Sequence, residues 1–287
     1  MYITFENEAG KIQLGGGADP FYKTLSIIGL GLPVKNVSVI EHVHMRGQVL
    51  VCQKDVARVI TIAGDICKRG ELRQEIARFT KILYKEGFLK LRFGSKKRMI
   101  KCRCTDFEDP KRTGPYATFV MQFTADDPAF TDFDIVKQHV FKRENMIEGT
   151  YALPMVMTKR ISGAQIINYG EIETFPLFYL TSNLSGAASD DVVVIKNETT
   201  GSVIELGYTP GKDETVCIDV ENARVTSNVK TEQNHEGNLI YEISDRTFLT
   251  DFCLVPGVNQ ITAACDNSSL LLHVVCEYYN RYIEAVY

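Results

Sequence analysis

The sequence of 287 residues predicts a mainly β protein of two domains. Short apolar or alternating segments separated by turn residues occur along most of the chain, and one segment alone has a clear helical periodicity. The length exceeds that of one ordinary domain. We therefore expect a β-rich N-terminal domain, residues 1–140, with one amphipathic helix and a β-hairpin, followed by a β-sandwich in residues 141–287.

The N-terminal domain opens with strand signals and then contains the helix. Residues 11–18 predict a strand that runs into a Gly-rich turn, and residues 25–40 contain short apolar runs broken by Gly and Pro. Apolar residues then recur at spacings of four, three and four. The four that define this face are Leu72, Ile76, Phe79 and Leu83. We expect an amphipathic helix of about four or five turns here, ended by Gly87.

A β-hairpin with a basic face follows the helix. Residues 89–93 alternate between apolar and basic side chains, residues 94–97 supply a turn, and residues 99–104 alternate again. Residues 117–123 predict another strand, which ends at Asp126, Asp127 and Pro128. Because Pro cannot donate to a ladder, we interpret the two aspartates as turn and capping residues rather than as paired catalytic acids.

The second half contains strand signals without a convincing helix. Residues 131–168 are less periodic and contain Gly and Pro, so we place the domain boundary there, near residue 140. Seven short strands at this rhythm predict a β-sandwich. The expected strands are Phe175–Leu180, Val192–Lys196, Val203–Leu206, Thr215–Val220, Asn238–Ile243, Asn259–Ala264 and Leu270–Glu277.

Composition and charge exclude several classes of protein. Apolar residues make up 45% and charged residues 24%, as in globular proteins rather than disordered or fibrous ones. We expect neither a signal peptide nor a membrane span, and reduced rather than paired cysteines for the eight present. Residues 68–112 hold fifteen Lys/Arg and six Asp/Glu, a net of +9, whereas residues 171–287 hold six and eighteen, a net of −12. The two halves are expected to face different partners or each other.

A metal site is the one candidate for chemistry. His42 and His44, like Cys102 and Cys104, are two residues apart, so each pair lies on one face of a strand. Together they could form a Cys2His2 zinc set, but the spacing is that of no known zinc module, and buried thiols with surface histidines are the plainer interpretation. No nucleophile, phosphate-loop or metalloprotease motif is present. We expect no enzyme activity and no cofactor.

Two binding functions also compete with a structural role. The basic run from Lys90 to Arg103 could contact a polyanion, but an acidic domain or neighbouring subunit is the favoured partner. A β-sandwich could also bind carbohydrate. The chain has no Trp, however, and Tyr278, Tyr279 and Tyr282 can equally be core and rim residues.

The order of these elements resembles the distal tail protein family of bacteriophages with long, non-contractile tails. The resemblance covers nearly the whole chain except residues 131–167, and it depends on the order of its turns rather than on any one motif. The segments that carry it are residues 123–130, Asn168-Tyr169-Gly170, Phe175-Pro176-Leu177, residues 197–201, Cys217-Ile218-Asp219 and residues 252–261.

The resemblance implies a fold, an assembly and a set of partners. It implies an N-terminal β-sandwich or split-barrel domain that builds a hexameric ring at the tail tip, and a galectin-like C-terminal β-sandwich. The ring would join the major tail protein to tail-associated (tail fibre or lysin-like) and receptor-binding proteins, around a channel through which DNA passes without specific binding. The protein would be made in the cytoplasm of the bacterial host and located in the virion, at the tail tip, with host-surface carbohydrate as a possible further ligand.

We expect ring contacts to come from the helix and the basic hairpin. Exposed hairpins readily extend the sheet of a neighbour, and complementary charge would favour contact between unlike surfaces. The residues chosen for the oligomer interface are Leu72, Arg73, Arg78, Lys90, Arg92, Lys96, Lys97 and Arg98. The alternative hypothesis is a carbohydrate-binding host-adhesion module, in which the sandwich would be the working part.

Overall fold

The computed structural model of the chain forms two compact units. The first comprises Met1–Phe133 and Tyr282–Tyr287, and the second comprises Asp134–Arg281. The residues that the structure describes are 1–16, 22–41, 43–44, 46–67, 71–108, 110–113, 116–145, 158–161, 163–182, 190–231, 235–265 and 272–285. This division differs from the expected one, because residue 140 lies within strand β12 (Val136–Asn145) and the last residues of the chain return to the first unit.

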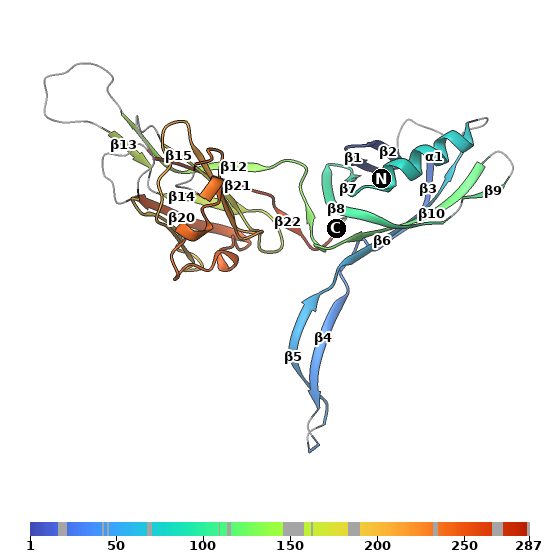
Figure 1. Cartoon of the computed structure of the whole chain (residues 1–287). Coiled ribbons are helices and arrows are strands. Elements are labelled where there is room, and N and C mark those ends of the chain that lie inside the picture. Colours follow the sequence, from blue (N-terminus) through green and yellow to red (C-terminus); the bar gives the residue numbers. More distant parts are fainter. Residues whose placement is uncertain are drawn as a thin grey trace, which may run out of the picture. The chain divides into compact units, whose positions relative to one another are not determined.

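The first unit is built on a ten-stranded sheet that almost closes on itself (Figure 1). The sheet order is β2-β1-β7-β8-β10-β6-β3, with three short strands at its margins. At its two ends, the hydroxyl of Thr24 donates a hydrogen bond of 2.6 Å to the carbonyl of Leu14, so a side chain joins strands β2 and β3 where no ladder does. The main strands are β1 (Tyr2–Asn7), β2 (Gly10–Gly15), β3 (Tyr22–Ile28), β6 (Arg58–Ile66), β7 (Gly87–Phe93), β8 (Lys96–Phe107) and β10 (Tyr116–Ala125), and the marginal ones are β9 (Lys111–Thr113), β11 (Phe130–Thr131) and β22 (Arg281–Tyr282).

The predicted helix is present and packs its apolar face into this barrel-like sheet. Helix α1 (Leu72–Leu83) has 12 residues, slightly more than three turns at 3.6 residues per turn, and is therefore shorter than expected. It ends at Tyr84, and Gly87 begins strand β7. Phe79 is fully buried, with its ring centroid 5.8 Å from that of Tyr22 and 6.1 Å from that of Phe119. Helix and sheet thus share one hydrophobic core.

The predicted basic hairpin is confirmed as strands β7 and β8. Their register pairs Gly87 with Cys102 and Phe93 with Lys96, and Gly94 makes the turn with a positive φ of 59°. Leu89 and Leu91 are fully buried, and the basic residues that alternate with them, Lys90 and Arg92, point away from the core. The alternation in the sequence therefore identified both strands and the face that each presents.

A second hairpin, which the sequence analysis did not identify, extends from the first unit. Strands β4 (Lys35–Glu41) and β5 (Gln48–Asp55) pair only with each other, and Figure 1 shows them leading away from the barrel as a long ribbon. Every residue of both strands is exposed. We call this hairpin the arm.

The second unit is a β-sandwich, as predicted. A six-stranded sheet with the order β13-β12-β21-β15-β18-β19 and a four-stranded sheet with the order β14-β20-β16-β17 enclose one hydrophobic core. Phe178 and Phe252 meet at its centre, with their rings edge to face at 5.3 Å. The strands not yet given are β13 (Thr158–Ile161), β14 (Gly163–Asn168), β15 (Leu177–Ser182), β16 (Val193–Asn197), β17 (Val203–Leu206), β18 (Thr215–Asp219), β19 (Arg224–Ser227), β20 (Gly257–Cys265) and β21 (Leu272–Tyr278).

Six of the seven strands expected in this unit are confirmed, and one prediction is wrong. Residues 238–243 contain the short 3₁₀ helix η2 (Ile240–Glu242) in place of a strand, in an excursion that also holds η1 (His235–Gly237) and η3 (Leu249–Asp251). The side-chain oxygen of Asn238 accepts a hydrogen bond of 3.2 Å from the amide of Ile240, which turns the chain. Among the described residues, no helix combines the length and apolar character that a membrane crossing requires.

Candidate assembly surfaces

The arm is an exposed ribbon with no other strand paired to it among the described residues. Val37 and Val39 lie on one face of β4, and the register places Leu50 opposite Val39. Because Ser38 pairs with Cys52, strand β5 has one additional residue, Val51, at a β-bulge. These four side chains remain 42–57% exposed.

Both faces of the arm also carry polar residues. On the face of Val37 and Val39 these are Gln53, opposite Val37, and the end pairs Lys35–Asp55 and Glu41–Gln48; the other face presents the pairs Asn36–Lys54, Ser38–Cys52 and Ile40–Val49. An isolated two-stranded hairpin is marginally stable in water, and its unpaired edges readily bind a further strand. The exposed apolar side chains and open edges together give the arm the properties of a docking surface.

Two of the predicted interface residues lie beside Phe133 in the first unit. Lys90 forms an ion pair of 3.0 Å with Glu6, and its hydrogen bond lowers the pKa of that carboxyl from the ordinary value of 4.5. The charged groups of Lys90 and Arg92 lie 5.9 and 5.5 Å from the centroid of the Phe133 ring. Lys90 is half-buried, whereas Arg92 is exposed.

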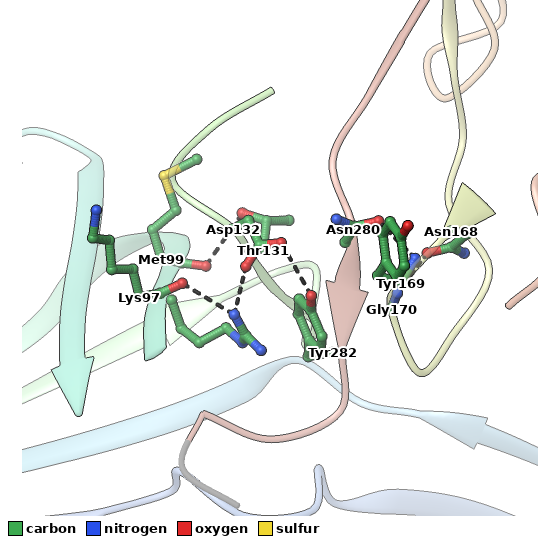
Figure 2. Close-up of polar contacts among 10 residues, drawn as sticks. Lys97, Met99, Thr131, Asp132, Asn168, Tyr169, Gly170, Asn280 and Tyr282 are labelled. Atoms are coloured by element: carbon green, nitrogen blue, oxygen red, sulfur yellow. Dashed lines mark hydrogen bonds and ion pairs between the residues drawn. The ribbon is translucent and has the colours of Figure 1, made fainter. Parts of the chain in front are cut away.

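Arg98 lies in a polar cluster inside the first unit rather than on a free surface. Figure 2 shows Asp132 and Tyr282 of this cluster. Its guanidinium forms an ion pair of 2.5 Å with Asp132 and lies 3.4 Å from the ring centroid of Tyr282. Tyr282 donates a hydrogen bond of 3.0 Å to the same carboxylate. The side chain of Arg98 is only 13% exposed, so this residue joins parts of one subunit.

The other predicted interface residues differ in exposure. Leu72 is half-buried against the core, and Arg78 donates hydrogen bonds to Glu75 and, at 2.7 Å, to the carbonyl of Lys11. The exposed basic residues on the helix and at the turn are Arg73, Lys96 and Lys97. Their contribution to contacts between subunits stays a prediction.

The three candidate zinc ligands that the structure describes, His44, Cys102 and Cys104, do not form a metal-binding group. His42 lies outside the described residues, and His44 is exposed in the turn of the arm. Cys102 and Cys104 lie on β8, where burial raises the pKa of the Cys102 thiol to about 12 and that of the Cys104 thiol to about 11. Within the described parts of the chain, no group of three or more His, Cys, Asp or Glu could hold a metal ion.

The two aspartates before Pro128 act as surface and turn residues. Asp126 is exposed and accepts two hydrogen bonds from Arg103, at 2.5 and 2.9 Å. Asp127 accepts one of 3.2 Å from the amide of Ala129, which caps the turn. Their roles match the plain interpretation of the sequence.

The fold as a whole matches that of a known phage protein. No protein-family model and no curated protein sequence matches this chain. Among solved structures, the Dit protein of phage SPP1, described as a paradigm of the hub adsorption apparatus in phages that infect Gram-positive bacteria, matches with a TM-score of 0.68 at 10% identity over 98% of each chain. The two chains share one fold. The resemblance to distal tail proteins that the sequence predicts is thereby supported across both units.

A second solved structure has a more distant likeness. A chain in the activated baseplate of phage P2 with calcium matches with a TM-score of 0.50 at 12% identity, over 96% of this chain and 97% of that one.

The sequence analysis missed the arm itself, although residues 35–41 and 48–55 each contain apolar residues suited to a strand. The signal available in the sequence was the alternation of the apolar residues Val37 and Val39 with the polar residues Asn36 and Ser38.

Proposed function

We propose that this protein is a structural component of the tail tip of a long, non-contractile phage or prophage tail. Six copies would form a hub ring that joins the major tail protein to tail-associated and receptor-binding proteins. The observation that supports this function best is the likeness to the SPP1 hub protein, because it extends over 98% of both chains and includes both units. In this function the protein acts by assembly rather than by catalysis.

In this proposal the first unit builds the ring, and the arm docks on a second copy of the chain. The arm and the surface that receives it are different surfaces, so the contact is heterologous and repeats from copy to copy until the ring closes. A neighbour that covers the apolar face of Val37, Val39 and Leu50 would remove from water the side chains that the isolated subunit leaves exposed. The exposed basic residues Arg73, Lys96 and Lys97 would add charged contacts at the rim.

The charges of the two units favour contacts between unlike surfaces. Residues 1–133 with 282–287 hold 21 Lys/Arg and 16 Asp/Glu, a net of +5, whereas residues 134–281 hold 11 and 20, a net of −9. Such an asymmetry steers subunits and partners into one orientation and suppresses contact between like surfaces. DNA would pass through the ring without specific contacts to this protein.

The eight cysteines all lie among the described residues and form no disulfide there, which fits synthesis in the reducing cytoplasm of a bacterial host before incorporation into the virion. Burial raises the pKa of several of them, including Cys276 in the core of the second unit. Such thiols pack as small apolar side chains and give no sign of a redox function.

Exposed aromatic residues support host adhesion as a second candidate function. Tyr169, Tyr241 and Phe248 in the second unit are 71%, 72% and 68% exposed, and aromatic faces are where sugars stack. Calorimetric titration with host cell-wall polysaccharide tests this function, since the hub function requires no affinity for sugar. Negative-stain images of the same preparation test the hub function, which predicts ring-shaped particles. Separate monomers that bind polysaccharide would contradict the hub and support adhesion.

A further inference from the structure

We infer that Arg58 and the C-terminal segment Tyr282–Ala285 form a lock that fixes the arm to the barrel. The root of the arm consists of residues 29–34, which lead into β4, and residues 56–57, which lead from β5 into β6. Arg58 is the first residue of β6 and is only 3% exposed. The existence of the lock depends on the first unit alone, whereas its consequence for assembly depends on the proposed function.

The Arg58 guanidinium joins three segments that are far apart in the sequence. It donates hydrogen bonds of 2.8 and 2.5 Å to the carbonyls of Gly29 and Gly31 in the root. It also donates to the carbonyl of Pro128 at 2.6 Å and to that of Ile283, in the C-terminal segment, at 2.5 Å. Removing any one segment would leave part of a buried cation without its acceptor, which is costly.

Only arginine can make this set of contacts. Burial lowers the pKa of Arg58, and the nearby charges of Asp55 and Asp127 raise it, but a guanidinium stays protonated in a protein. Its planar group carries five N–H donors in a fixed geometry and stacks on aromatic rings. Here it lies 4.6 Å from the centroid of the Phe130 ring. Lysine would place a single ammonium at this position and could not reach all four carbonyls in the same directions.

The root itself is closely packed against β6. Gly29 has a φ of +98°, and a Cβ atom added there would lie 2.1 Å from the carbonyl oxygen of Val59. The amide of Val56 donates a hydrogen bond of 2.8 Å to the carbonyl of Val34, which closes the two sides of the root. Glycine at position 29 thus allows the backbone to come close enough for the lock to form.

The C-terminal segment connects the root with the body of the barrel. The amide of Ala285 donates a hydrogen bond of 3.1 Å to the carbonyl of Leu30, and Ala285 is 1% exposed. At the other end of the segment, Tyr282 lies under the guanidinium of Arg98. It also donates a hydrogen bond to Asp132, as Figure 2 shows. Residues 282–285 therefore complete the attachment of an element that begins at residue 35.

A fixed root has a direct consequence for docking. Ordering a mobile element on binding costs conformational entropy, which weakens the affinity. An arm that is already held in one direction therefore binds more tightly than one that swings about its root. We expect loss of the lock to loosen the arm without unfolding the barrel.

Hydrogen exchange in the full-length protein tests the lock. In Arg58→Lys we expect amide exchange in the root, including the Val56 amide, to accelerate at least about tenfold, while exchange in β10 stays unchanged. The matched control is Arg103→Lys, which changes an exposed arginine and should alter neither segment. If Arg58→Lys does not fold, Ala285→Pro carries the test, because it removes the one N–H that bonds to Leu30.

The results separate the lock from the proposed function. Unchanged exchange in the root of a folded variant would overturn the lock, whatever the solution mass. Faster exchange in the root with weaker assembly would support both the lock and docking through the arm. Faster exchange with unchanged assembly would support the lock and contradict the use of the arm in the ring.

Discussion

The double substitution Val39→Thr with Leu50→Thr tests docking through the arm. The two residues face each other across the strands and are 42% and 57% exposed. Complete burial of such a side chain contributes about 1.5–3 kcal/mol, so covering the half still exposed should contribute about 1 kcal/mol for each residue. Threonine is β-branched and therefore suits a strand at both positions. We therefore expect each contact between subunits to weaken by about 2 kcal/mol, or roughly 30-fold in its dissociation constant.

The assay is light scattering over a dilution series of wild type and variant. The double variant should dissociate at a concentration well above that of the wild type, while its stability as a separate chain changes by no more than about 0.5 kcal/mol because both positions are on the surface. Phe248→Thr is the matched control, since Phe248 is 68% exposed in the second unit. If the double variant dissociates at the same concentration as the wild type, the reasoning about the arm is refuted.

Three further predictions concern thiols, core packing and pH. The exposed Cys52 of the arm should react with a maleimide in dilute protein, while Cys102, whose pKa burial raises to about 12, should stay unmodified; mass spectrometry of labelled peptides checks this, and rapid labelling of Cys102 would contradict it. Phe119→Ala should lower the free energy of unfolding by about 3–5 kcal/mol, because the buried ring contacts Phe79, and a loss under about 1 kcal/mol in a denaturant titration would show that the core is not packed as described. The folded-state pKa of Glu6 is below its ordinary value of 4.5, so its ion pair stabilises the fold above about pH 4.5. This contribution to stability is lost as the pH falls through the folded-state pKa. Glu6→Gln should remove that part of the pH dependence in melting experiments, and an unchanged profile would argue against the pair.

Local patterns predicted the helix and the basic hairpin because their signals lie within a few residues. Apolar residues at helical spacing place Phe79 in the core, and strict alternation buries Leu89 and Leu91. The strands of the second unit followed in the same way from turn residues between short apolar segments. The prediction of a strand at residues 238–243 was wrong because the apolar side chains there belong to 3₁₀ turns, into which Asn238 directs the chain.

Other features depend on partners far away in the sequence. Strand β12 pairs Val136 with Tyr278, and no local pattern indicates that pairing. Arg98 was expected on an interface because it lies in a basic run, yet Asp132 and Tyr282 enclose it within one subunit. Gly29 was interpreted as a simple turn residue, whereas the structure uses it at the root of the arm.

The solution mass of the purified protein tests the central claim most directly. A hub ring predicts a mass near six times 32.3 kDa by light scattering, with ring-shaped particles in negative-stain images. A mass of 32.3 kDa at every concentration would contradict assembly of this protein into a ring through the arm.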